Sequence, residues 1–288
     1  MNYTEQTVTF ACEQDTLAGI LATPDVAAST GVIVIVGGPQ YRAGSHRQFV
    51  LLSRALAAAG YPVLRFDYRG MGDSEGQQRD FLAVGADIAA AIDALQAHMP
   101  WVKRVGLWGL CDGASAALLY CHETHDPRVG GLCLLNPWVR SETGLAKTQV
   151  KYYYTQRLAQ KEFWVKLLSG KVAASAASGL MRSLKTAFSA PASADGRKSG
   201  QSFQARMAQA WAQFKGPILL VLSGNDYTAK EFLEHTAAET AWAAALSHPR
   251  LARHDCPGAD HTFSRDGDRD TVEALTIRWL LQCSQLLT

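Results

Sequence analysis

Short apolar runs rich in β-branched residues alternate with longer amphipathic stretches along most of this chain. The alternation is typical of a mostly parallel sheet with helices on both faces, because consecutive parallel strands need a crossover that is usually a helix. An antiparallel edge hairpin is predicted over 7–11 and 17–22, and later strands over 32–36, 62–67, 104–108, 129–135, 218–222 and 250–255. Helices are predicted over 48–59, 80–98, 229–246 and 271–286, with a helix of small residues after Gly113. The fold class that follows is α/β.

The alternation stops in the segment 139–215, where Lys, Gln, Ala and aromatic residues recur at helical spacing and a Ser-, Ala- and Pro-rich stretch occupies 189–202. We therefore divide the chain into a core of residues 1–138 and 216–288 and a helical insertion of residues 139–215. Such a long insertion predicts a lid over the functional site. The alternative is a structural excursion or an oligomer contact, which leaves a homodimer open. A lid would offer an apolar pocket wall from Tyr152, Tyr153, Tyr154, Phe163 and Trp164.

The charge balance, the N-terminus and the length of the apolar runs indicate which partners and which cellular location to expect. The chain has 28 Lys and Arg residues against 26 Asp and Glu residues and no long basic run, so we expect no nucleic-acid partner. The N-terminus lacks a basic segment followed by an apolar stretch, which is the pattern of a secretory signal. The apolar run 32–36 is far too short to span a bilayer. These features predict a cytoplasmic protein without stable membrane insertion.

Six cysteines are scattered along the chain without the paired spacing of a disulfide framework or a zinc site. We expect reduced thiols, of which five behave as small buried hydrophobes. Cys111 differs, because it lies in Gly109-Leu110-Cys111-Asp112-Gly113 between a predicted strand and a small-residue helix. This is the pattern of a nucleophile elbow, in which small residues flank a nucleophile held on a sharp turn. Cys111 is therefore the predicted nucleophile.

The helix that follows Cys111 predicts both an activated thiol and a first oxyanion donor. The N-terminal amides and dipole of a helix stabilise an anion, and a neighbouring imidazole would lower the thiol pKa further. Attack on a carbonyl would then need little help from a base. The backbone amide of Asp112 would donate to the oxygen that becomes negative in the tetrahedral intermediate.

A glycine-rich loop after the first buried strand predicts the second oxyanion donor. Pro39 has no amide hydrogen, so we choose Gly38, with the Gln40 amide and the Tyr41 hydroxyl as alternatives. A plain tight turn without a function is the other interpretation. Gln40 and Tyr41 belong to this loop, and His46 lies shortly after it. We take all three as candidate substrate-binding residues.

The base and its acid are expected after the nucleophile, in the order nucleophile, acid, histidine. His261 lies in a turn-rich stretch after the last predicted strand, where the base of such a triad belongs. Asp226 follows the strand 218–222 and is the predicted partner that orients the imidazole. Asp255 and Asp260 are the rival acids, one placed early on a strand and one adjacent to the histidine.

No cofactor or metal motif accompanies these residues. The glycine-rich stretch 65–76 does not match the spacing of dinucleotide-binding or phosphate-binding loops. His122 and His125 are three residues apart rather than four, which is wrong for a zinc helix. We expect neither a cofactor nor a metal.

Together, the turn 67–76, the elbow at Cys111, Asp226 and His261 resemble the α/β-hydrolase superfamily over nearly the whole chain. The cysteine in the elbow is similar to that of dienelactone hydrolases, whose triad is Cys-Asp-His. The segments 37–42, 44–49 and 66–74 resemble the first of the two exosortase A system-associated hydrolases of bacteria. The superfamily resemblance implies an α/β-hydrolase fold, in which the predicted insertion 139–215 would be a helical cap. The exosortase resemblance implies a gene neighbourhood of exopolysaccharide synthesis and envelope protein sorting. It implies no established substrate.

The sequence thus predicts a hydrolase of carboxylic esters or thioesters that acts on a small-molecule acyl substrate through an acyl-cysteine intermediate. An acyltransferase with the same triad would pass the acyl group to an alcohol or amine instead of water. A non-catalytic binding protein on a hydrolase scaffold is the third possibility, since a fold alone does not determine function. The intact triad argues against it.

Overall fold

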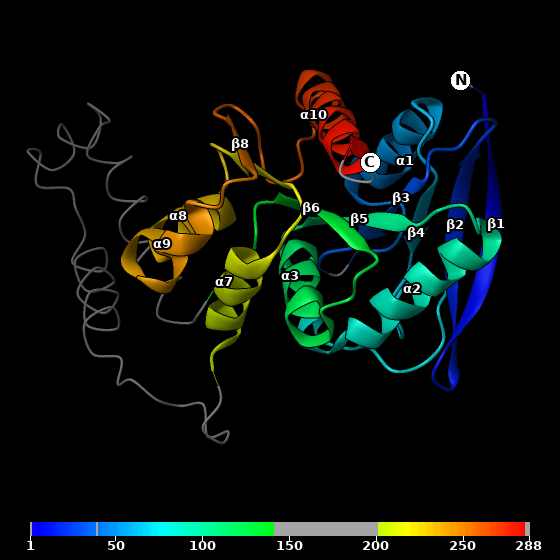
Figure 1. Ribbon diagram of the computed structural model, residues 1–288, viewed down its shortest axis with the longest axis horizontal. Coiled ribbons are helices and arrows are strands. Elements are labelled where there is room, and N and C mark those ends of the chain that lie inside the picture. The colour runs from blue at the N-terminus through cyan, green and yellow to red at the C-terminus, as the bar shows by residue number, and fades with distance from the viewer. Residues whose placement is uncertain (1, 39, 141–200, 286–288) are drawn as a thin grey trace, which may run out of the picture.

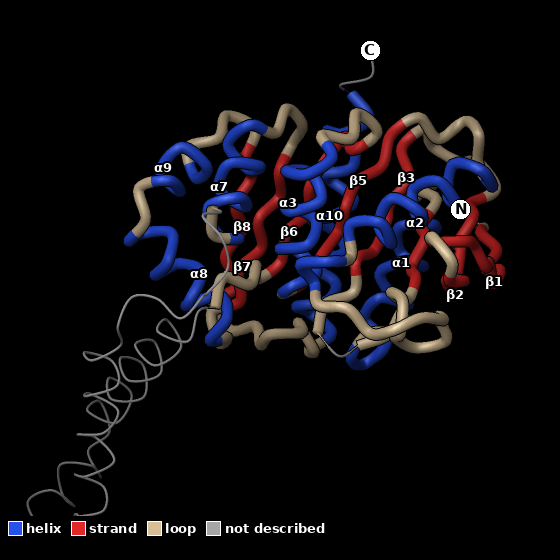
Figure 2. The backbone as a smooth tube through the Cα atoms, turned by 90° about the horizontal axis from the view of Figure 1, so that it is seen from below, coloured by secondary structure: helices blue, strands red, loops and turns tan. Residues whose placement is uncertain are grey.

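The computed structural model describes residues 2–38, 40–140 and 201–285. Its centre is an eight-stranded sheet in the order β1-β2-β4-β3-β5-β6-β7-β8. β1 (Tyr3–Cys12) and β2 (Asp15–Pro24) form the antiparallel edge hairpin, and β2 also pairs antiparallel with β4. In the order of the sheet, the six strands from β4 to β8 run parallel, as the alternating sequence pattern predicted. Figure 2 shows strands of the sheet side by side. They are β3 (Thr30–Ile35), β4 (Val63–Phe66), β5 (Arg104–Leu110), β6 (Val129–Leu135), β7 (Ile218–Ser223) and β8 (Leu251–Cys256).

Helices cover both faces of this sheet (Figure 1). On one face α1 (Gln48–Ala58) packs beside α10 (Asp266–Gln285). The other face carries α2 (Gly85–His98), α3 (Asp112–Thr124) and α7 (Phe203–Gln213), with α3 and α7 packed side by side. Because both faces are covered, every residue of β3, β4, β6 and β7 is buried, which explains their continuous apolar sequences.

Two predicted helices are interrupted in the structure. The first residues of the predicted helix 80–98 form a separate 3₁₀ turn, η2 (Phe81–Ala83). The Asp80 side chain caps this turn by accepting a hydrogen bond from the Leu82 amide. The predicted helix 229–246 is wrong as a single element, because Glu239 is extended between α8 (Tyr227–Ala238) and α9 (Ala241–Leu246). The break lets Trp242 of α9 turn inward, where it packs on Trp211 and Phe232 with ring centroids 5.8 and 5.4 Å away.

The closing helix α10 starts at Asp266 rather than at residue 271, with Asp266 and Asp268 in its first turn. Carboxylates at this position favour a helix through the partial positive charge of its N-terminus. A short 3₁₀ turn, η1 (Ser45–Arg47), precedes α1. Within the described residues, no helix is long and apolar enough to cross a membrane.

The predicted insertion 139–215 is described only at its two ends. Its C-terminal part forms α7, which packs against α3 and α9. The aromatic residues at 152–154, 163 and 164 lie outside the described residues, so the lid stays a prediction.

Candidate functional site

Cys111 lies on a strained turn between β5 and α3. Its φ and ψ angles are 60° and −126°, a combination that costs free energy for any residue with a side chain and is typical of a nucleophile elbow. Both flanking glycines are required sterically. A Cβ atom on Gly109 would lie 2.5 Å from the carbonyl carbon of Gly113, and one on Gly113 would lie 2.5 Å from the carbonyl oxygen of Ile35. The spacing of glycines around Cys111 therefore reflects the close approach of β3, β5 and α3.

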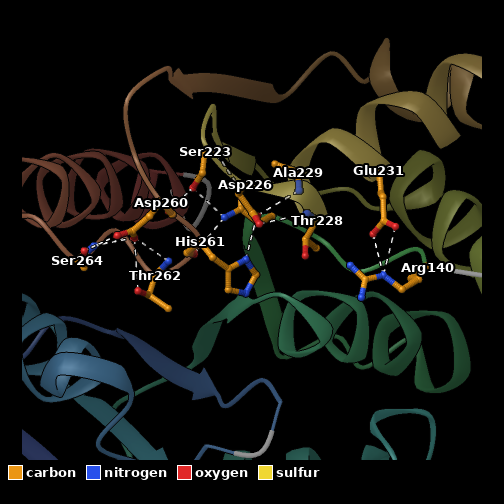
Figure 3. A network of polar contacts seen from close by, with 11 residues as sticks. Arg140, Ser223, Asp226, Thr228, Ala229, Glu231, Asp260, His261, Thr262 and Ser264 are labelled. Atoms are coloured by element: carbon orange, nitrogen blue, oxygen red, sulfur yellow. Dashed lines mark hydrogen bonds and ion pairs between the residues drawn. The ribbon is translucent and has the colours of Figure 1, made fainter. Parts of the chain in front are cut away.

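His261 and Asp226 form a hydrogen-bonded pair on the loops that follow β8 and β7. The His261 Nδ1 atom lies 2.8 Å from Oδ2 of Asp226. Figure 3 marks this contact. The Asp226 carboxylate also caps α8, because it accepts hydrogen bonds from the amides of Thr228 at 3.1 Å and Ala229 at 3.2 Å. The helix end thus holds the carboxylate in one orientation and stabilises its negative charge. With Nδ1 bonded to Asp226, Nε2 is the ring nitrogen left for proton transfer.

The two rival acids are engaged elsewhere. Asp255 pairs with Arg253 at 3.0 Å on the exposed side of β8. Asp260 accepts hydrogen bonds from the amides of Thr262 and Ser264 at 3.1 and 3.0 Å, so it closes the turn that carries His261 (Figure 3). Asp226 is the acid that lies against the imidazole.

Asn136 and Ser223 hold the histidine loop, and the sequence analysis did not identify either residue. The buried Asn136 amide donates to Ser223 Oγ at 2.9 Å and to the His261 carbonyl at 3.2 Å. In return the Ser223 amide donates to Asn136 Oδ1 at 2.9 Å, and Ser223 Oγ donates to the Asp260 carbonyl at 2.8 Å. These bonds link the ends of β6 and β7 to the loop after β8. An asparagine after a strand is too common a pattern to have revealed this role.

The predicted oxyanion donors are present, but one of them is occupied. The Gly38 amide donates to Oδ1 of Asp112 at 2.5 Å, so the side chain of the residue after Cys111 covers the predicted second donor. Burial raises the pKa of the Asp112 carboxyl, and the amides of Gly38, Asp112 and Gly113 oppose that rise. A substrate oxygen could use the Gly38 amide only after this carboxyl group had moved.

The resting thiol does not match the expectation of an activated thiolate. Burial raises the pKa of Cys111 to about 12, and the negative charge of Asp112 adds to the rise. The Asp112 backbone amide and the Arg140 charge act in the opposite direction without reversing it. The helix N-terminus is present as predicted, but desolvation and a neighbouring carboxylate outweigh it. Cys111 is therefore a neutral thiol near pH 7.

The candidate substrate-binding residues lie around the same loops. Gln40 braces its own loop, since its side-chain oxygen accepts the Ser45 amide at 3.1 Å. Tyr41 is exposed. His46 lines a cavity of about 220 Å³ with Thr262 and Phe263, the two residues that follow His261. The structure thus brings His46 beside the histidine loop, while Gln40 has a local bracing role.

Arg140 is a further charged residue of this region that the sequence analysis missed. Its Nε atom donates to the buried Glu231 carboxylate at 2.9 Å (Figure 3). Its guanidinium stacks on the Trp138 ring, 4.3 Å from the ring centroid. Burial raises the pKa of Glu231, and Arg140 opposes that rise. The pair places an anchored cation on the side of the site where the chain leaves β6.

One protein family matches the chain over residues 27–268, which is most of its length. The family is described as Hydrolase_4, serine aminopeptidase S33. The chain belongs to this family. It is accordingly an α/β hydrolase by family and by fold. The family's description names a serine, whereas this hydrolase has Cys111 in the elbow.

Solved structures of hydrolases share this fold over nearly the whole chain. An esterase of Pyrococcus furiosus is 17% identical with a TM-score of 0.65, covering 97% of this chain and 91% of its own. A dienelactone hydrolase of Anabaena variabilis is 16% identical with a TM-score of 0.59, covering 98% of each chain. A proline iminopeptidase of Mycobacterium smegmatis is 15% identical with a TM-score of 0.61, covering 98% of this chain and 100% of its own. At these identities the likeness concerns the fold alone.

A curated relative matches a shorter segment. The lysophosphatidylserine lipase ABHD12 of Danio rerio is 35% identical over 92 residues. This segment is 30% of the present chain and only 22% of the relative, so the match spans about a fifth of that protein.

Proposed function

We propose that this hydrolase cleaves carboxylic esters or thioesters through an acyl-cysteine intermediate on Cys111, with His261 as base and acid and Asp226 as its orienting partner. The observation that carries the proposal is the combination of a strained cysteine after β5 with the hydrogen-bonded His261–Asp226 pair after β8 and β7. The carboxyl ends of parallel strands lie at one edge of the sheet, where α/β enzymes bind their ligands.

The first half of the reaction forms the acyl-enzyme. His261 Nε2 takes the proton from the Cys111 thiol as Sγ attacks the substrate carbonyl carbon, and the carbonyl π electrons move to the oxygen. Because the pKa of the thiol is about 12, this proton transfer is a required step rather than an accessory one. The imidazolium, stabilised by Asp226, then protonates the departing alkoxide or thiolate as the tetrahedral intermediate collapses.

The second half restores the enzyme. His261 removes a proton from water as the water oxygen attacks the acyl carbon, and the carbon–sulfur bond breaks to release a carboxylic acid. Cys111 Sγ recovers its proton from the imidazolium. In both halves the negative oxygen would be held by the amides of Asp112 and Gly38, after the Asp112 carboxyl group has left Gly38.

The substrate class is inferred from the family, from the similar proteins and from one charged residue near the site. The family is one of hydrolases, and an esterase, a dienelactone hydrolase and a lipase among the similar proteins are named for ester bonds. The family description and the proline iminopeptidase are named for peptide bonds, so the acylation panel also includes an aminoacyl p-nitroanilide. The resemblance to exosortase-associated hydrolases makes acyl esters connected with exopolysaccharide synthesis reasonable candidates. The anchored Arg140 suits a substrate with negative charge near its acyl or leaving group.

Capture of the acyl-enzyme tests the proposal. A panel of p-nitrophenyl esters and acyl thioesters, with an aminoacyl p-nitroanilide, is incubated with the protein, quenched in acid and analysed by peptide mass spectrometry. We expect the acyl mass on the peptide that contains Cys111, in wild type but not in Cys111→Ala. Cys256→Ala, which removes a buried thiol outside the triad, is the matched control and should retain both the adduct and turnover.

The same assay separates the alternatives. Acylation of another residue in Cys111→Ala, with turnover retained, would overturn the cysteine mechanism. Transfer of the acyl group to an added alcohol in preference to water would identify an acyltransferase. A complete lack of turnover and of adduct across the panel would favour a binding protein.

A further inference from the structure

A cavity of about 460 Å³ lies at the amino-terminal edge of the sheet, opposite the triad. Its lining includes Arg104, which begins β5, Val129, which begins β6, and Arg250, directly before β8. Cys111 follows the other end of β5, which at seven residues is about 20 Å long. The cavity is therefore separate from the catalytic site, and its volume lies in the range of small-molecule pockets.

Three basic residues line this cavity without a carboxylate partner among the described residues: Arg104, Lys215 and Arg250. Most arginines in the described part of the chain do pair with a carboxylate, as Arg69, Arg128 and Arg269 illustrate. The Arg250 guanidinium is not free to swing away, because its Nη1 atom donates to the Lys215 carbonyl at 2.6 Å. The cations thus come from three separate segments and converge on one space.

The one acid in the lining does not neutralise them. Asp126 accepts hydrogen bonds from Arg128 Nη2 at 2.7 Å and from the Tyr120 hydroxyl at 2.6 Å. The Arg128 contacts lower the pKa of Asp126 against the effect of burial, so its charge is already balanced by that arginine. Burial and the charge of Arg206 lower the pKa of His122, which leaves that imidazole neutral near pH 7. The net charge facing the cavity is positive.

Apart from Gln213 and His125, the rest of the wall is apolar. Val129, Ala210 and Phe214 contribute hydrocarbon surface between α3, α7 and β6, beside the Cys121 side chain. A cavity that combines unpaired cations with an apolar wall matches a ligand that has both an anionic head and a hydrocarbon body.

We propose that this cavity binds a small organic anion, a carboxylate or a phosphate monoester that carries a short apolar chain. The head would lie between Arg104 and Arg250, where guanidinium groups form charge-assisted hydrogen bonds to carboxylate and phosphate oxygens. The chain would lie along Phe214 and Ala210. The inference does not depend on the reaction at Cys111.

Calorimetric titration of the full chain tests this site. The probes are hexyl phosphate, hexanoate, inorganic phosphate and hexanol, and all titrations use Cys111→Ala so that no probe reacts at the elbow. We expect at least one of the two amphiphilic anions to bind in a one-to-one ratio, more tightly than inorganic phosphate, and hexanol to bind weakly. The better of the two anions identifies the head group. Arg104→Gln and Arg250→Gln should each weaken binding about tenfold, the effect of losing one hydrogen bond to a charged group.

Arg253→Gln is the matched control, because Arg253 is an exposed arginine of β8 whose partner is Asp255. Its affinity should equal that of the parent. Equal affinities in all three variants would place the anion elsewhere, for example at the triad, and would overturn the proposal. Equal binding of hexanol, or of inorganic phosphate, would overturn the proposed ligand class. The thermal midpoint of each variant without ligand checks its fold, and Lys215→Gln replaces any variant that fails this check.

Discussion

The two edges of the sheet differ in the sign of the charge that they gather. The carboxyl-terminal edge holds the Asp112 and Asp226 carboxylates beside Cys111, whereas Arg104, Lys215 and Arg250 line the amino-terminal edge. The helices explain part of the difference. α3 and α8 begin at the carboxyl-terminal edge and present amides there, and α3 and α7 end near the opposite edge. Helix N-termini favour anions and C-termini favour cations, so helix direction favours the observed sign at each edge.

The two edges also differ in how their charges are satisfied. Asp226 bonds to two helix amides and an imidazole, and Asp112 bonds to the Gly38 amide. Arg104, Lys215 and Arg250 at the opposite edge have no carboxylate partner within the described residues. One edge is thus organised around internal partners, and the other has unused capacity for a ligand. This contrast predicts that substitutions at the two edges have effects of very different size.

The largest effect is expected from His261→Ala. With a thiol pKa of about 12, only about one molecule in 10⁵ carries a thiolate at pH 7 when no base assists. We expect kcat/KM for an ester substrate to fall at least about 1000-fold, and to recover partly as pH rises towards the pKa of the thiol. His248→Ala removes a histidine that contacts the Phe214 carbonyl at the other edge, and its kcat/KM should stay within about twofold of wild type. Equal losses in the two variants would contradict the division of roles.

Asp226→Asn should cost about 100-fold or more in kcat. An amide at this position can present its NH₂ group to Nδ1 and so favour the wrong imidazole tautomer, while the side chain keeps its shape. Asp126→Asn is the matched change at the opposite edge, where it weakens the contact with Arg128. It should lower the thermal midpoint without changing kcat. The two parameters are measured on both proteins, and a loss of kcat in Asp126→Asn would show that the edges are coupled.

Asp112→Asn should have an effect of intermediate size, and it should make the Cys111 thiol more reactive rather than less. The negative charge of Asp112 favours the protonated thiol, so its removal lowers the pKa of Cys111 below about 12. A fall of one unit would raise the rate of Cys111 alkylation by iodoacetamide about tenfold at any pH well below the pKa. The pH dependence of labelling, followed by peptide mass spectrometry, gives the shift. An unchanged profile would mean that the Asp112 charge does not contribute to this pKa.

The smallest effect is expected from Arg104→Gln in the absence of ligand. Because Arg104 has no carboxylate partner within the described residues, its loss should change the free energy of unfolding by no more than about 0.5 kcal/mol. Turnover should be unchanged. Urea denaturation and a steady-state ester assay measure the two quantities. A large destabilisation would show that Arg104 is already satisfied within the protein, which would weaken the case for a ligand.

Local sequence patterns predicted the parts of this protein that depend on near neighbours. Strand β6 matches its predicted bounds, and the other strands lie within a few residues of theirs, because continuous apolar runs report burial on both faces directly. The elbow was visible because the close approach of chains forbids side chains at Gly109 and Gly113. Asp226 and His261 stood out by their positions after consecutive strands of the sheet. Helix ends were predicted less well, since the break at Glu239 serves the packing of Trp242 on distant rings.

Tertiary structure alone decided the electrostatics. Helix position by itself indicated a thiolate at Cys111, but the pKa rises because the folded core excludes water and Asp112 lies beside the thiol. The contact between Gly38 and Asp112 joins residues 74 positions apart, and the bond from Asn136 to the His261 carbonyl joins residues 125 positions apart. The cation-lined cavity likewise assembles from the starts of different strands. Periodicity encodes which residues are buried, whereas charge and solvation depend on which distant segments they are buried against.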